Sequence, residues 1–180
     1  MISEILEEIG AHIKGKNPAF NAYFAGATQI AEGKVVLLDS RGEMCYVGLD
    51  DKRGNFFYIR DVEDVEMDEP EERITSCRET EAELPARLVV WFKRGVQDKI
   101  VTAILNDLMT YKSTVPGVMQ SRTVPVGVIT DYDDLFEAET GRAVTKRIKG
   151  ITLLALDFNV VFVYRTQAEE CLDRNFCAPC

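Results

Sequence analysis

The feature that most restricts the fold is a run of fifteen residues near the end of the chain, ITLLALDFNVVFVYR (151–165). Alternate residues from Thr152 to Tyr164 are almost all apolar, whereas Asp157 and Asn159 interrupt the other set. Because successive side chains of a strand point to opposite faces, the pattern predicts a strand with one core face and one mixed face. Such a strand would span roughly 50 Å, far more than a usual strand of about 5–6 residues. We therefore expect it to bend, emerge into solvent or meet a neighbouring molecule at Asp157 and Asn159, which we predict to be interaction residues.

The composition limits the partners. The chain has 180 residues, 46% of them hydrophobic, and a net charge of −9, which suits one globular core and opposes binding to phosphate backbones or anionic lipid. We predict no sequence-specific nucleic-acid binding and no membrane partner. An acidic N-terminus and the lack of a long uncharged apolar segment predict a soluble, unexported protein. Five cysteines in a chain of this size suit a reducing compartment.

The order of the predicted elements indicates the fold class. Apolar residues at helical spacing predict a helix over 2–13, with Ser3 available as its cap and Lys14 before Gly15 as its end. A meander of strands should follow, and after it a buried strand should lead through Gly95 into a strongly amphipathic helix. We predict an α+β fold, a mainly antiparallel sheet with an N-terminal helix and one central helix packed on it. The predicted strands are 35–39, 44–49, 56–62, 84–93 and 123–129, the last an edge strand because Pro125 cannot donate to a ladder.

One domain over 1–168 and a short tail over 169–180 account for the whole chain. Within the domain, residues 61–83 carry eleven acids and only two bases, which predicts a solvated acidic loop or strand edge. A specific electrostatic role for this region would involve Glu69, Glu71 and Glu72, which we include among the predicted interaction residues.

The tail holds the candidate metal ligands. Cys177 and Cys180 have the two-residue spacing that lets two thiolates reach one zinc ion, and Cys171 could be a third ligand. A closed site needs a fourth, so reduced thiols in a packed tail and a disulfide formed on isolation are alternatives. The zinc reading predicts a cytoplasmic protein-binding adaptor with a zinc-stapled tail.

A second acidic cluster allows another alternative. Five carboxylates crowd the segment TDYDDLFEAETG, and such groups can hold Mg²⁺ or Ca²⁺. The pattern lacks the glycine of an EF-hand loop, whereas Thr130 and Asp133 have the spacing of a capping box at the start of a short helix. Helix capping is the favoured interpretation, and a carboxylate-metal hydrolase is the alternative. The five carboxylates are Asp131, Asp133, Asp134, Glu137 and Glu139.

The sequence contains no recognisable catalytic motif. His12 is the only histidine, and no serine or cysteine is spaced to use it, so it is predicted to lie at the surface or the helix end. Neither GxGxxG nor GxxxxGK[ST] occurs. We therefore expect a protein that is not an enzyme and has no cofactor apart from the zinc considered above.

The helix at ISEILEEI, the meander of strands, the unit LVVWFKRGVQDKIVTAILNDLM and the last strand LLALDFNVVFVY resemble, in this order, tail-terminator and tail-completion proteins of tailed bacteriophages and prophages. The resemblance spans most of the chain and rests on element order. It implies a virion structural protein, assembled in the bacterial cytoplasm, that forms a homo-oligomeric ring, commonly a hexamer. Its partners would be the tail tube and the head-tail connector, and an acidic lumen would suit passing DNA. The cysteine tail and the 61–83 segment have no counterpart in the family.

Overall fold

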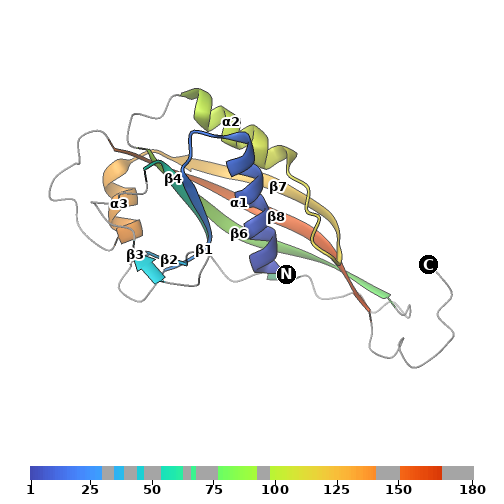
Figure 1. Ribbon diagram of the computed structural model, residues 1–180. Helices are drawn as coiled ribbons and strands as arrows, with labels where there is room; N and C mark the ends of the chain where they lie inside the picture. The colour runs from blue at the N-terminus through green and yellow to red at the C-terminus, as the bar shows by residue number, and fades with distance from the viewer. Residues whose placement is uncertain are drawn as a thin grey trace.

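The computed structural model describes residues 1–29, 35–38, 44–46, 54–62, 66–67, 77–92, 98–140 and 151–167. Three helices and eight strands lie in this described part and form an α+β fold, as predicted (Figure 1). They are α1 (Ile2–Lys16), β1 (Ala22–Gln29), β2 (Val35–Leu38), β3 (Met44–Tyr46), β4 (Phe56–Asp61), β5 (Glu66–Met67), β6 (Cys77–Phe92), α2 (Asp98–Thr110), β7 (Val118–Ile129), α3 (Tyr132–Thr140) and β8 (Thr152–Gln167).

The strands form one mainly antiparallel sheet. Their order is β3-β2-β1-β4-β6-β8-β7, and β5 pairs with β6 beyond the end of β4. Only the β1–β4 pair is parallel among the described strands. Strand β1 was missed from the sequence, because its small residues AYFAGATQ lack a clear apolar alternation. Strand β7 lies at an edge of the described sheet, as Pro125 predicted, and starts five residues earlier than the predicted boundary at Thr123.

Strands β6 and β8 form the longest pair. Each has sixteen residues, and they pair without a register shift from Cys77 opposite Gln167 to Phe92 opposite Thr152. The predicted core face of β8 is confirmed, since its side chains pack into a core with α1 and α2. Fully burying one such Leu, Val or Phe contributes about 1.5–3 kcal/mol, so this face commits the strand to the sheet. The buried side chains are those of Leu154, Leu156, Phe158, Val160 and Phe162.

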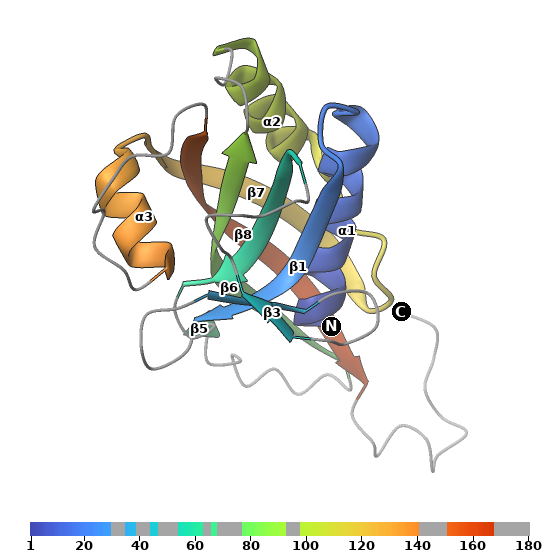
Figure 2. The same ribbon diagram turned by 60° about the vertical axis from the view of Figure 1, so that its left-hand side comes forward.

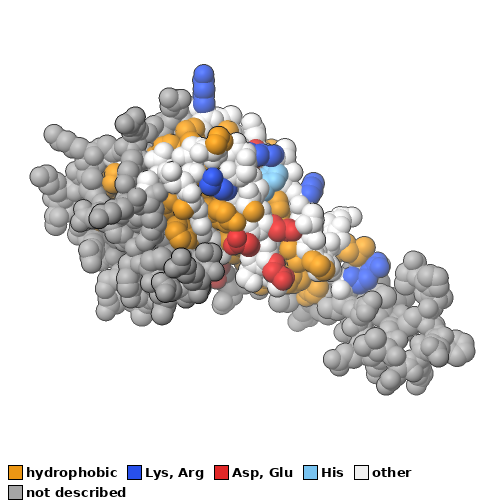
Figure 3. All heavy atoms as spheres, viewed as in Figure 1, with side chains coloured by type: hydrophobic (Ala, Val, Ile, Leu, Met, Phe, Trp, Pro, Cys, Tyr) orange, Lys and Arg blue, Asp and Glu red, His pale blue; other side chains and the backbone are white. Residues whose placement is uncertain are grey.

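Helices cover both faces of the sheet. Figure 2 shows α1 and α2 on one side and α3 near one end of the other. Under α3 lies a second, smaller core, to which β8 contributes Leu153 and Ala155. The face of β8 predicted to be mixed is therefore core at its start, carries polar Asp157 and Asn159 in its middle, and becomes apolar again at Val161 and Val163. On the side of α1 and α2, acidic side chains gather in the middle of the face and basic side chains lie separately around them (Figure 3).

The ends of α1 differ from the prediction. The helix begins at Ile2 after Met1, so Ser3 lies inside it and does not cap it. It also continues through Gly15 to Lys16. Asn17 ends it, because its backbone N–H and its Nδ2 both donate to the Ile13 carbonyl, at 3.0 and 2.9 Å. The Asn17 side chain also donates to Asp107 of α2 at 2.7 Å, which fixes the two helices to each other.

Segment 61–83, predicted to be a solvated acidic loop or a strand edge, is strand at 66–67 and again from 77 onward. Residues 77–83 belong to β6 and pair with β8, and Glu66 and Met67 form β5. Buried and exposed side chains alternate along this part of β6, since Thr80, Ala82 and Leu84 are buried and Glu81 is exposed. The high number of acids in the segment obscures this alternation in the sequence. Glu69, Glu71 and Glu72 lie outside the described residues.

Candidate functional site

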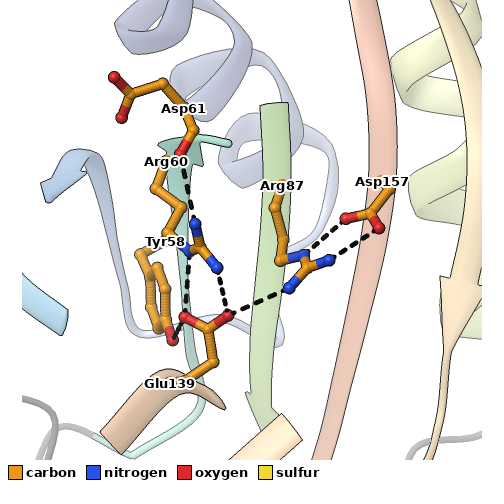
Figure 4. A network of polar contacts seen from close by, with 6 residues as sticks. All are labelled: Tyr58, Arg60, Asp61, Arg87, Glu139 and Asp157. Carbon is orange, nitrogen blue, oxygen red and sulfur yellow. Dashed lines mark hydrogen bonds and ion pairs between the residues drawn. The ribbon is translucent and has the colours of Figure 1, made fainter. Parts of the chain in front are cut away.

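A network of buried charges lies between α3 and the sheet (Figure 4). Glu139, in the last turn of α3, is 0% exposed. Its carboxylate accepts a hydrogen bond from the Tyr58 hydroxyl at 2.8 Å. It also accepts two from Arg60, from Nε at 3.2 Å and from Nη2 at 2.9 Å. Since buried charges are tolerated when they are paired and hydrogen-bonded, α3 is held to the sheet by a fully partnered carboxylate.

The sheet register explains why a carboxylate is needed there. Arg60 of β4 and Arg87 of β6 are directly opposite each other, and like charges so placed repel. Glu139 Oε1 lies 2.9 Å from Arg60 Nη2 and 3.6 Å from Arg87 Nη1, so it bridges both cations. Arg87 also binds Asp157 of β8 in a bidentate pair, Nε to Oδ1 at 2.6 Å and Nη2 to Oδ2 at 2.9 Å. Two cations and two anions thus alternate in one neutral row.

Two members of the network, Tyr58 and Arg87, have raised pKa values. Burial, with the nearby Glu139 carboxylate, raises the pKa of Tyr58 well above its usual value, so its hydroxyl stays protonated and donates. Hydrogen bonds to Asp157 raise the pKa of Arg87 against the opposing effect of burial. What this arrangement does chemically is to lock α3, β4, β6 and β8 together.

The two predicted interaction residues on β8 already have partners within the chain. Asp157 pairs with Arg87, and the Asn159 side-chain amide donates to Glu83 of β6. The β6–β8 pairing continues past both residues without a register shift, so β8 does not leave β6 at this point. The irregularity is instead on β7, whose register shifts between Pro125 and Gly127, opposite Asp157. Contact of Asp157 and Asn159 with another molecule stays a prediction.

The carboxylates of segment 131–139 do not converge on one site. Asp131 Oδ1 accepts the backbone N–H groups of Asp133 and Asp134 at 2.9 and 3.2 Å, so Asp131 caps α3. The predicted capping box at Thr130 and Asp133 is wrong, because the helix begins one residue later than it requires. Glu139 lies at the other end of α3, in its last turn, and accepts hydrogen bonds from Arg60. In the part of the chain that the structure describes, no group of three or more His, Cys, Asp or Glu side chains is arranged to hold a metal ion.

His12 lies on α1, packed edge-on against the Tyr111 ring with centroids 5.8 Å apart. The residue is half-buried, and its Nε2 is buried with no hydrogen-bond partner among the described residues. The cysteines Cys171, Cys177 and Cys180 lie outside the described residues, and their zinc role stays a prediction.

A second polar cluster, missed from the sequence, joins α1 to the segment before β7. Glu8 accepts the Tyr111 hydroxyl at 2.7 Å and the Ser113 hydroxyl at 2.9 Å. The Thr114 backbone N–H and hydroxyl complete the set at 3.0 and 2.5 Å. Burial raises the pKa of Glu8, but these four hydrogen bonds outweigh it and lower the pKa to about 2. The sequence shows three hydroxyl side chains close together, Tyr111, Ser113 and Thr114, but nothing local points from them to Glu8.

The open edge of β7 is the most exposed apolar feature of the described sheet. Val126 is 64% exposed at the bulge, and the neighbouring strand residues Val124 and Val128 are also exposed. Nearer the start of β7, Met119 is exposed beside a groove that includes Arg122. The groove is also lined by Glu81 of β6, by Lys112 before β7, and by Val161 and Val163 of β8.

Among the described residues, no helix is both long enough and apolar enough to cross a lipid bilayer. A scan against protein-family models gave no match, and a search of curated proteins found no significant relative.

Proposed function

We propose that this chain is a structural subunit of a phage or prophage virion, a ring-forming tail terminator or head-tail joining protein. The observation that carries the proposal is the long ribbon of β6, β8 and β7, which extends past the helix-covered body and ends in an open strand (Figure 1). The element order on which the resemblance rests is also that of the folded chain: an N-terminal helix, strands, a long strand leading to a helix, and a long final strand.

The open strand has properties suited to a protein contact. Three valines and one methionine on β7 are exposed, and clustered exposed apolar side chains commonly mark interaction surfaces. An unpaired edge strand also offers backbone groups to a neighbouring molecule. The exposed side chains are those of Met119, Val124, Val126 and Val128.

Strand β7 also has features that limit backbone pairing of its edge with strands of other molecules. Pro125 removes one backbone donor, and two register shifts, at 118–120 and 125–127, interrupt the regular ladder. Natural edge strands use proline and bulges to prevent indiscriminate sheet extension. A closed ring requires a contact of this kind, specific in geometry and limited in number.

The rigid end of the sheet supports the same role. The network of Tyr58, Arg60, Glu139, Arg87 and Asp157 fixes the strands from which the ribbon extends, so the direction of the ribbon is set by the body. A ring subunit needs such a fixed direction, because closure depends on a constant rotation between neighbours. The net charge of −9 suits a lumen that repels DNA and lets it pass.

Light scattering over a wide concentration range, with negative-stain electron microscopy, tests the proposal. We expect a discrete ring or a concentration-dependent oligomer of fixed stoichiometry. Co-purification with a tail-tube or connector protein encoded beside it would identify the partner. A protein that stays monomeric at the highest concentration and recruits no ring of another protein contradicts the proposal.

A further inference from the structure

Three hydrogen-bond donors of the buried charge network belong to the sheet itself. Tyr58 and Arg60 lie on β4, and Arg87 lies on the adjacent β6, directly opposite Arg60. Arg87 is also fixed by its bidentate pair with Asp157 of β8. Strand pairing and this ion pair therefore position the three donors without a contribution from α3.

Glu139 of α3 accepts from these donors in the manner of a bound carboxylate (Figure 4). Its Oε2 accepts hydrogen bonds from the Tyr58 hydroxyl at 2.8 Å and from Arg60 Nε at 3.2 Å. Its Oε1 accepts one from Arg60 Nη2 at 2.9 Å and lies 3.6 Å from Arg87 Nη1. Two parallel bonds from one guanidinium are the geometry by which arginine recognises carboxylates. Each carboxylate oxygen thus has two partners on the sheet.

The charge of the sheet requires an anion at this position. Arg60 and Arg87 carry two positive charges and Asp157 carries one negative charge, so without Glu139 one cation is not neutralised. Arg60 is buried, and a buried charge without a partner is strongly unfavourable. One carboxylate satisfies this requirement, whichever molecule supplies it.

The position of Glu139 on α3 is locally unfavourable. Glu139 lies in the last turn of the helix, where the negative end of the helix dipole disfavours a carboxylate. Residues 137–140 include no lysine or arginine that would favour this end. The helix alone therefore does not account for a glutamate there, whereas the donors of the sheet do. Residues that break a local rule in this way are found at functional sites.

The apolar side chains of α3 also contact the sheet as those of a docked helix do. Tyr132, Leu135, Phe136 and Glu139 have the spacing i, i+3, i+4 and i+7, which is the anchor pattern of an amphipathic helix bound in a groove. Leu135 and Phe136 are buried in the smaller core, where the Phe136 ring meets the Trp91 ring edge-on with centroids 6.4 Å apart. Helix α3 thus binds the sheet through one apolar face and one carboxylate.

We propose that Tyr58, Arg60 and Arg87 form a carboxylate-binding site of the sheet, which Glu139 fills as an internal ligand. The chain holds α3 beside the donors and so gives its carboxylate a high effective concentration. An external carboxylate therefore binds only where the Glu139 side chain is removed or displaced. The site goes beyond the proposed ring and is independent of it, since all three donors belong to one chain.

Acetate added to the Glu139→Ala protein tests the site, because the atoms that this substitution removes correspond to one acetate ion. Acetate should raise the melting temperature of this variant by about 3 °C or more relative to chloride at the same ionic strength, as a ligand bound to the folded state does. Trp91 is the only tryptophan and lies in the core under α3, so its fluorescence should follow a saturable binding curve. Acetamide, the neutral analogue, should produce neither effect.

Glu139→Gln is the matched control, since glutamine fills the same space without the charge. It should show no saturable response to acetate, and the wild type, whose site is filled, should show none either. Glu137→Ala, an exposed change on the same helix, controls for the general effect of acetate on protein stability.

The outcomes decide the proposal. A saturable acetate response confined to Glu139→Ala supports it, and so does refolding of this variant in acetate when it does not fold in chloride. Equal responses of Glu139→Ala and Glu139→Gln overturn it, because acetate then binds elsewhere. A folded Glu139→Ala protein without a response, or one that refolds in neither salt, also overturns it, because the sheet then does not hold its donors in place. None of these measurements depends on ring assembly, so the two proposals hold or fail separately.

Discussion

The two ends of the β6–β8 pair use charged residues in different ways. Under α3, Arg60 and Arg87 are adjacent, and Glu139 and Asp157 neutralise both inside the chain. Toward the other end, Arg122 of β7 and Glu83 of β6 both lie opposite Val161 of β8, and Glu83 accepts a hydrogen bond from the Asn159 amide. The same pair of strands thus carries a helix-covered ionic network at one end and separated charged side chains at the other. The difference teaches that a covering helix that supplies a carboxylate, and not the strand sequence alone, decides whether charged side chains on this sheet join into one network.

The strongest way to break the comparison is to remove the central carboxylate of the helix-covered network. Glu139→Ala leaves Arg60 and Arg87 opposite each other without an anion between them. Breaking a buried pair by removing one partner costs about 3–5 kcal/mol, so the free energy of unfolding should fall by that amount in denaturant titrations. Glu137→Ala, an exposed change on the same helix, is the control and should stay within about 0.5 kcal/mol. A loss under about 1 kcal/mol for Glu139→Ala means that α3 does not depend on the network.

The next variant changes Asp157, the most exposed carboxylate of the network, where the loss of a charge pair should cost less stability. Asp157 is 26% exposed, so Asp157→Asn removes the bidentate charge pair with Arg87 while solvent can compensate in part. We expect the free energy of unfolding to fall by about 1–2 kcal/mol, less than for Glu139→Ala. The same titration measures it. If Asp157→Asn lowers the free energy of unfolding more than Glu139→Ala does, Glu139 is not the carboxylate on which the network depends most.

Acid titration sharpens the comparison by testing how the open strand is attached to the body. Glu8 holds the segment before β7, and its pKa is lowered from 4.5 to about 2. A carboxylate with a lowered pKa in the folded state stabilises the fold above pH 4.5, and this contribution is lost as the pH falls from 4.5 toward 2. Allowing for screening at a partly exposed site, the loss should be about 1 kcal/mol.

Glu8→Gln is the matched variant for this titration. It should be less stable than the wild type at pH 7, and the difference should shrink between pH 4.5 and 2. Thermal unfolding at several pH values measures both proteins. Parallel curves for the two proteins over this range would show that Glu8 is not the group responsible.

The smallest expected effect on stability is at the exposed edge. Val126→Ser replaces a side chain that is 64% exposed, so the monomer should change by less than about 0.5 kcal/mol. Its effect should instead be on assembly, where the dissociation constant should rise. Equal assembly of Val126→Ser and the wild type would remove this valine from the contact.

The sequence predicted the regular parts of the fold well. The apolar alternation of β8, the strand-to-helix unit and the edge strand at Pro125 are all present, because each depends on local periodicity or on one backbone donor. It did not predict β1, whose small residues carry no period. Nor did it predict that residues 77–83 extend β6, because a high density of acids masked the buried alternation of Thr80 and Ala82.

The candidate site was harder to predict than the fold. Asp157 stands out in the sequence as a charged residue on an apolar strand, but its partner Arg87 is 70 residues away and no local pattern predicts the pair. Glu139 was grouped with four neighbouring carboxylates, since spacing alone cannot say which way a helix end faces. The Glu8 cluster brings together residues more than 100 apart, and no local pattern predicts it.

By itself, the sequence determined that this protein is an α+β chain with one dominant strand, a net negative charge and two amphipathic helices at its start and middle. These properties follow from short-range periodicity and composition, which do not depend on contacts between distant parts of the chain. Only the tertiary structure decided that Arg60 and Arg87 lie side by side, and that Glu139 neutralises them. Strand register and helix docking set these distances, and both depend on pairing between segments far apart in the chain.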